Sequence, residues 1–175
     1  MRFSSFVSAT ASALMLTGCS DLLSLNSFVP DKESVADPSL AGTWKGSDEE
    51  ALYIVLQTNS AYSITYTDKK DTAKFQGHLM NAGEAEILDL VVERESAFQI
   101  PVHMIVRVWP KGSTLRWVFL DSKWLRELAV QQLASQPSGD RTLISAPGEA
   151  VRDLVQKYGA DTKAYDNKPN VLVRQ

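Results

Sequence analysis

The sequence predicts a mainly β domain in which an eight-stranded antiparallel meander closes into a barrel, with one helix before the last strand and one C-terminal helix. Three observations support this fold class. Short apolar segments recur roughly every ten residues after Leu40, turn-forming residues separate them, and two later segments carry apolar residues at helical spacing. Closure removes the exposed edges of a meander. The alternative is an open, curled sheet backed by the two helices.

The predicted strands are best seen where apolar and polar residues alternate. Tyr62, Ile64 and Tyr66 lie on one face of such a segment and hydroxyl side chains on the other. A Pro-Lys-Gly-Ser sequence at 110–113 indicates a hairpin turn. The eight predicted strands are 42–44, 52–58, 62–67, 73–80, 85–93, 102–109, 115–120 and 141–145.

Two helices are expected after the seventh strand. Asp121 is the predicted N-cap of the first, and Pro147 lies in the first turn of the second, which ends at Gly159. We interpret both apolar stripes as packing faces. They consist of Trp124, Leu125, Leu128, Ala129 and Leu133 in the first helix, and Val151, Leu154, Val155 and Tyr158 in the second.

Composition excludes several classes of protein. The chain has 175 residues, is 44% hydrophobic and 22% charged, and has a formal net charge of −3, which does not suit a protein that neutralises nucleic-acid phosphates. No uninterrupted apolar run approaches the roughly 20 residues of a membrane-spanning helix. We therefore expect no nucleic-acid partner and no polytopic membrane protein.

The N-terminus predicts a lipid anchor. Arg2 precedes an uncharged apolar segment that is typical of a signal peptide. The segment ends in Leu-Thr-Gly-Cys at 16–19, which resembles a bacterial lipobox and contains the only cysteine, Cys19. We expect residues 1–18 to be removed as a signal peptide and Cys19 to be lipidated, with palmitate or related acyl chains.

Ser20 follows the cysteine and bears on localisation. By resemblance to the sorting rule of Gram-negative lipoproteins, a residue other than Asp at this position implies the periplasmic face of the outer membrane. Removal of Arg2 with the signal peptide changes the formal charge from −3 to −4, so membrane attachment would depend on the acyl chains.

The rest of the chain divides into three predicted regions. Residues 19–38 are expected to be a lipid-anchored linker that spans at most ~65 Å, although Leu22, Leu23 and Leu25 could pack on the domain instead. Residues 39–160 are the predicted barrel domain. Residues 161–175 are a predicted loose C-terminal tail.

The start of the first strand carries a family resemblance. Gly42-Thr43-Trp44 resembles the Gly-x-Trp signature of lipocalins and related calycin barrels, in which the Trp plugs one end of the barrel. Many lipocalins pack an Arg over that Trp, and the resemblance leaves three candidates for it: Arg107, Arg116 and Arg141.

The region from Leu40 to about Tyr158 also resembles a group of uncharacterised bacterial lipoproteins. This resemblance implies a barrel on a lipid tether and no assigned activity. The residues that carry it are Phe75, His78-Leu79, Leu88-Asp89-Leu90, Pro101-Val102-His103, Leu120-Asp121 and Trp124-Leu125.

Aromatic residues are the candidate ligand-binding set. They could line a pocket or fill the core, and the sequence leaves both possibilities open. The residues are Trp44, Tyr53, Tyr62, Tyr66, Phe75 and Trp117.

His78, Asp89 and His103 are the candidates for a zinc site or a general base, and His78 and His103 are the only histidines. Their spacings of 11 and 14 residues do not form a metal motif, and no nucleophile elbow or phosphate-binding glycine loop is present.

We therefore expect no enzyme activity, no metal and no cofactor. Of three functional hypotheses, a hydrolase or metal enzyme is the last. The first is a lipoprotein that binds a small apolar or amphipathic ligand in its barrel. The second is a structural or interaction lipoprotein with a filled barrel and an envelope protein partner.

Overall fold

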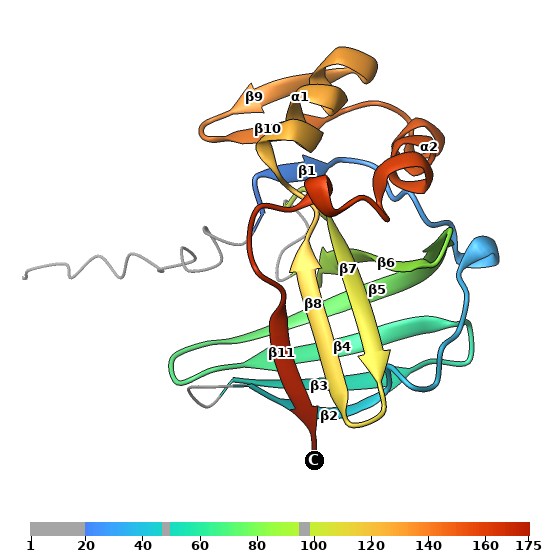
Figure 1. The fold of residues 1–175 in the computed structure, drawn as a ribbon, viewed down its shortest axis with the longest axis vertical. Coiled ribbons are helices and arrows are strands. Elements are labelled where there is room, and N and C mark those ends of the chain that lie inside the picture. The colour runs from blue at the N-terminus through green and yellow to red at the C-terminus, as the bar shows by residue number, and fades with distance from the viewer. Residues whose placement is uncertain (1–19, 47–49, 95–98) are drawn as a thin grey trace, which may run out of the picture.

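A closed antiparallel β-barrel forms the body of the protein (Figure 1). The computed structural model describes residues 20–46, 50–94 and 99–175. Eight strands pair in a ring, and the β6–β7 and β11–β2 pairings complete it. They are β2 (Gly42–Lys45), β3 (Ala51–Leu56), β4 (Ala61–Thr67), β5 (Thr72–Ala82), β6 (Ala85–Val92), β7 (His103–Lys111), β8 (Thr114–Phe119) and β11 (Asn170–Arg174). This confirms the predicted fold class and is compatible with a lipocalin-like fold.

The identity of the eighth barrel strand differs from the prediction. The segment expected at 141–145 forms β10 (Arg141–Ile144), which lies outside the barrel. The barrel is closed by β11, inside the region predicted to be a loose tail. β11 pairs with both β2 and β8 and buries Leu172 completely. The tail prediction was wrong because these pairings satisfy backbone groups that β2 and β8 would otherwise expose.

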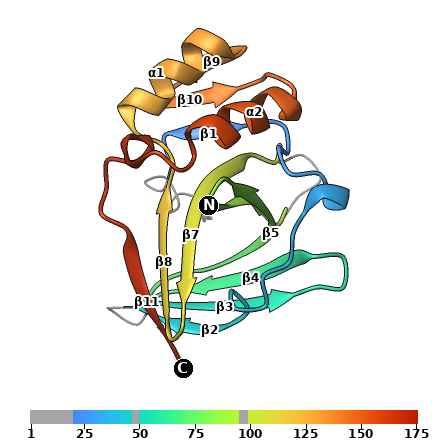
Figure 2. The ribbon, with the colours of Figure 1, turned by 45° about the vertical axis from the view of Figure 1, so that its right-hand side comes forward.

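A smaller layer covers one wall of the barrel (Figure 2). It contains β1 (Leu22–Ser24), β9 (Ser135–Ser138), β10 and the helices α1 (Lys123–Gln132) and α2 (Gly148–Tyr158). β1 pairs antiparallel with the start of β7 and parallel with β10, so this layer is continuous with the barrel sheet.

Both helices are present where they were expected. The N-cap of α1 is Ser122, whose hydroxyl accepts a hydrogen bond of 3.1 Å from the Leu125 amide. The prediction of Asp121 was one residue early. The apolar stripe of α2 packs against β5 on the outer face of the barrel, and Leu125 and Ala129 of α1 join the same core from above β9 and β10.

Residues 20–41, which we call the N-terminal strap, lie against the barrel. The strap contains β1 and the short helix η1 (Asp31–Glu33). Leu22 and Leu23 are buried, and the Val35 amide donates to the Leu79 carbonyl at 2.9 Å. The expectation of a free linker is therefore wrong over the described part of 19–38. The alternative, in which the leucines of this segment pack on the domain, holds for Leu22 and Leu23, which are buried.

The barrel has two unlike ends. At the closed end, β3–β4, β5–β6 and β7–β8 are joined by short turns, and the strap residues 34–41 cross the end. At the open end, β2, β4, β6 and β8 finish, and β3, β5, β7 and β11 begin. A second short helix, η2 (Thr162–Ala164), precedes β11.

Two hydrophobic cores result from this arrangement. One fills the barrel interior and includes Trp44, Tyr62 and Leu79. The other lies between the outer barrel wall and the helices, and includes Phe28, Ile87 and Ile105. β6 and β7 contribute to both cores, which explains why they are apolar on both faces near their centres.

Candidate functional site

The inner wall of the barrel follows from strand alternation. Successive side chains point to opposite faces, and directly paired residues share a face. The register pairs Ile54 with Ile64, and Ile64 with Phe75, so these side chains form one inward row. The same rule, applied around the ring, places most of the candidate aromatic residues inside.

Trp44 and Arg174 seal the barrel near its closed end. The Trp44 indole is fully buried, and its Nε1 donates to the Leu40 carbonyl at 2.9 Å. The Arg174 guanidinium carbon lies 4.1 Å from the centre of the Trp44 ring. Its Nη1 donates to the Ala41 carbonyl at 2.8 Å, and its Nη2 donates to the Ser39 carbonyl. The pair therefore joins the first and last barrel strands to the strap.

The arginine over Trp44 is none of the three predicted candidates. Arg107 and Arg116 lie over a different ring, that of Trp109, at 4.5 and 5.2 Å from its centre. Arg141 is on β10, outside the barrel. Arg174 was missed because it lies in the segment that was predicted to be a loose tail.

Polar groups also meet at the closed end. The buried Tyr62 hydroxyl accepts from the Asp37 amide at 2.7 Å and lies 3.1 Å from the Asp37 carbonyl, to which it donates. Burial raises the pKa of Tyr62. Glu86 faces inward beside them, since it is paired with Val108. Burial, followed by the charge of Asp37 and a hydrogen bond with it, raises the pKa of Glu86 to about 7.

The open end is lined by half-buried apolar side chains. Trp117 and Phe119 face inward and contact each other edge to face, with ring centres 5.3 Å apart. The Trp117 Nε1 atom is buried and has no hydrogen-bond partner among the described residues. Other half-buried side chains that pack on the interior core here are Leu52, Tyr66, Ala73, Leu90, Val92 and Val102.

Five of the six predicted ligand-binding residues face the interior. Trp44, Tyr62 and Phe75 are buried, and Tyr66 and Trp117 are half-buried towards the open end. Tyr53 instead points outward and is 44% exposed. Its neighbours Leu52 and Ile54 occupy the inward positions of β3, so the strict alternation of the strand places Tyr53 outside.

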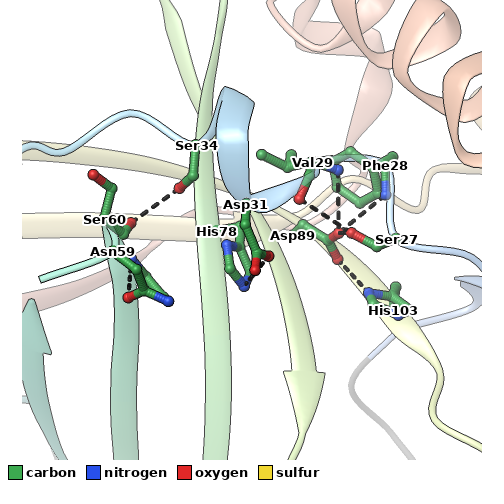
Figure 3. A network of polar contacts seen from close by, with 11 residues as sticks. Ser27, Phe28, Val29, Asp31, Ser34, Asn59, Ser60, His78, Asp89 and His103 are labelled. Carbon is green, nitrogen blue, oxygen red and sulfur yellow. Dashed lines mark hydrogen bonds and ion pairs between the residues drawn. The ribbon is translucent and has the colours of Figure 1, made fainter. Parts of the chain in front are cut away.

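His78, Asp89 and His103 share the outer face of the barrel (Figure 3). Asp89 is only 1% exposed, and one carboxylate oxygen lies 2.7 Å from His103 Nδ1. The other accepts from the Ser27 hydroxyl at 2.7 Å and from the Phe28 and Val29 amides at 3.0 and 3.4 Å. The Asp89 carboxylate therefore holds the N-terminal strap on the barrel wall.

This arrangement does not resemble a catalytic or metal centre. The Ser27 hydroxyl contacts the aspartate, whereas an activated nucleophile needs a contact with the imidazole. His78 Nε2 lies 3.7 Å from Asp31 on the strap. Among residues 20–46, 50–94 and 99–175, no group of three His, Cys, Asp or Glu side chains is placed to hold a metal ion.

Two shallow cavities lie outside the barrel. One, of about 200 Å³, is between the strap, β5 and α2, and Arg152 and Glu33 form an ion pair at its edge. The other, of about 400 Å³, lies between α1 and β10. Neither is lined by the inward-facing aromatic residues.

The predicted lipidation site, Cys19, is outside the described residues. Ser20 is 5% exposed, and Asp21 is held by an ion pair of 2.7 Å with Arg126 on α1. No helix in the described part of the chain is long and apolar enough to cross a membrane.

Comparison of the chain with protein-family models, curated protein sequences and solved structures gave no match.

Proposed function

We propose that this chain is a lipoprotein of the periplasmic face of the outer membrane that holds a small apolar or amphipathic ligand in its barrel. Cleavage before Cys19 and acylation of its thiol would supply the membrane anchor. The support is the lipobox-like sequence at 16–19, which follows a signal-like segment. The resemblance to uncharacterised bacterial lipoproteins supports the same lipid anchor.

The uneven filling of the barrel carries the ligand-binding proposal. Trp44, Tyr62 and Leu79 are fully buried, so they fill their part of the interior. Towards the open end, inward aromatic and aliphatic side chains are only half-buried. An apolar lining with few polar groups is typical of small-molecule sites.

One polar group in this lining favours an amphipathic ligand. Indole Nε1 is a donor only, and an unpaired buried donor costs about 1–3 kcal/mol. The Trp117 Nε1 atom is such a donor. A carboxylate or ester oxygen at the polar end of a single-chain amphiphile would satisfy it, while the chain contacts the apolar wall.

Native mass spectrometry of the protein purified from its host tests this proposal. A bound mass of a few hundred daltons that is released on unfolding supports it. A bare polypeptide mass, together with no binding of added palmitic acid, contradicts it.

Acyl labelling in cells tests the anchor separately. Cys19→Ala should abolish incorporation of labelled palmitate, and a lipoprotein signal-peptidase inhibitor should cause the precursor to accumulate. Unchanged labelling and migration would contradict lipidation.

The second candidate is an interaction lipoprotein with a filled barrel. The outer face of β3 and β11, which flank β2, carries four exposed apolar side chains: Tyr53, Val55, Val171 and Val173. Such patches mark protein interaction sites. In-cell crosslinking from position 55 separates the two candidates, because only this one requires a stoichiometric protein partner.

A further inference from the structure

We propose that the lipid anchor holds the open end of the barrel against the membrane surface, rather than letting the domain move on a tether. This inference rests on the proposed lipidation of Cys19. It goes further because it gives the domain one orientation, in which the open end of the barrel contacts the bilayer.

The first step is the short distance between the anchor and the folded domain. Ser20 is 5% exposed, and its hydroxyl donates to the Leu22 carbonyl at 2.9 Å. One peptide unit joins Cys19 to Ser20, and consecutive Cα atoms are about 3.8 Å apart. The acyl-bearing residue is therefore within about 4 Å of the ordered strap, whereas a free linker could extend for tens of ångströms.

The second step is the firm attachment of the residue that follows. The Asp21 amide donates to an Asp121 carboxylate oxygen at 3.2 Å, and the Asp21 carbonyl accepts from the Thr142 amide at 2.7 Å. The Asp21 side chain pairs with Arg126. These contacts come from α1, from β10 and from the connection between β8 and α1, so the start of the strap moves with the domain.

The third step places this attachment at the open end. Asp121 comes two residues after β8, and β8 finishes at the open end. β1 pairs with the first residues of β7, through Leu23 with Met104 and Ser24 with His103. Leu23 packs with the interior core, so β1 extends the barrel wall at this end.

The side chains of the open end suit a lipid surface. Ile100, in the segment before β7, is 72% exposed. The β4–β5 turn at the same end carries two Lys and two Asp residues at 68–71, and Glu50 before β3 lies near Asp68, so this end has no basic patch. The anchor, rather than a basic patch, would therefore determine the orientation. The half-buried aromatic lining would then lie nearest to the lipid.

Depth-dependent quenching tests this orientation. The lipidated full-length protein is placed in phospholipid vesicles that contain a headgroup-level spin-labelled lipid, with a fluorophore attached at Ile100→Cys. Ser113→Cys is the matched control, because Ser113 is exposed in the β7–β8 turn at the closed end. Cys19 does not react with the fluorophore once it is acylated.

We expect quenching at position 100 to exceed that at position 113 by roughly threefold or more, since the nine residues of β7 separate the two ends by about 20–30 Å. Insertion of about ten Gly and Ser residues between Cys19 and Ser20 should bring the two values together, because a flexible linker frees the domain. Equal quenching without the insertion, or stronger quenching at 113, would overturn the orientation while leaving lipidation intact. Absence of acylation would overturn both proposals.

Discussion

The Arg174 guanidinium stacks on the Trp44 ring, with 4.1 Å between the guanidinium carbon and the ring centre, and joins the last strand of the barrel to the first. β2 and β11 are paired directly, with Arg174 opposite Trp44. The same guanidinium binds carbonyl groups of the strap at Ser39 and Ala41. One side chain thus connects the last strand to the end of the strap and to β2, more than 120 residues earlier in the sequence.

Replacement of Arg174 should destabilise the protein. Arg174→Gln removes the cation–π contact and the charged donors to the strap, so we expect a loss of about 2–3 kcal/mol in the free energy of unfolding. Urea denaturation measures it. Arg116→Gln is the control, because Arg116 is exposed and makes only a longer contact of 5.2 Å with the Trp109 ring, so its loss should cost less than about 1 kcal/mol. Equal losses in the free energy of unfolding would show that the contacts of Arg174 with Trp44 and the strap add no more stability than the contact of Arg116 with Trp109.

Removal of β11 should prevent the barrel from closing. A chain that ends at residue 169 exposes the edges of β2 and β8 and loses the buried Leu172. We expect aggregation and loss of sharp tertiary signals in circular dichroism near 280 nm. A chain that lacks only Gln175 should remain soluble and folded. A soluble, folded chain without β11 would contradict the assignment of the closing strand.

Asp89 should be essential for holding the strap. In Asp89→Asn, an amide NH₂ group replaces one of the two carboxylate oxygens. This NH₂ group then faces either the three donors of the strap or the His103 ring. We expect a loss of about 2–4 kcal/mol and faster proteolysis within residues 20–41. Asp31→Asn is the control, since Asp31 is exposed and lies 3.7 Å from its histidine partner. Unchanged proteolysis in Asp89→Asn would exclude this role.

Glu86 should make stability depend on pH near neutrality. Its pKa is about 7 in the folded protein, against an ordinary value of 4.5. Between these values the folded state holds a proton that the unfolded state has released, so stability falls as pH rises from about 4.5 to 7. Asp121, with a pKa raised by burial to about 6, acts in the same direction.

The Glu86→Gln variant isolates this contribution. Glutamine carries no charge, so its stability relative to the wild type should increase between pH 5 and pH 8. Thermal unfolding at both pH values measures the difference. A constant difference between the two proteins would show that Glu86 does not titrate in this range.

Trp117 should contribute to ligand binding through its indole donor. In the mature chain with Cys19→Ser, Trp117→Phe should weaken binding of palmitic acid about tenfold, as expected for loss of a charged hydrogen bond of about 1.5 kcal/mol. Trp124→Phe removes an indole from α1, in the outer core, and should leave the affinity unchanged. Native mass spectrometry reports both affinities. Equal weakening by the two variants would argue against a specific donor.

The sequence determined the barrel strands from β2 to β8, because alternation and turn chemistry act between neighbouring residues. It placed Trp44, Tyr62, Tyr66, Phe75 and Trp117 on inner faces, but it did not exclude Tyr53, whose aromatic character suits either face of a strand. The same local patterns located α1 and α2 to within a residue or so of their observed starts.

Only the tertiary structure decided which strand closes the barrel and where the strap lies. β10 and β11 are both short and only partly apolar, and the pairing partners that distinguish them are distant in the chain. The role of Asp89 depends on Ser27, 62 residues away, and that of Arg174 depends on Ala41, 133 residues away. Local preference cannot specify such contacts, because they form only when closure of the barrel brings the distant segments together.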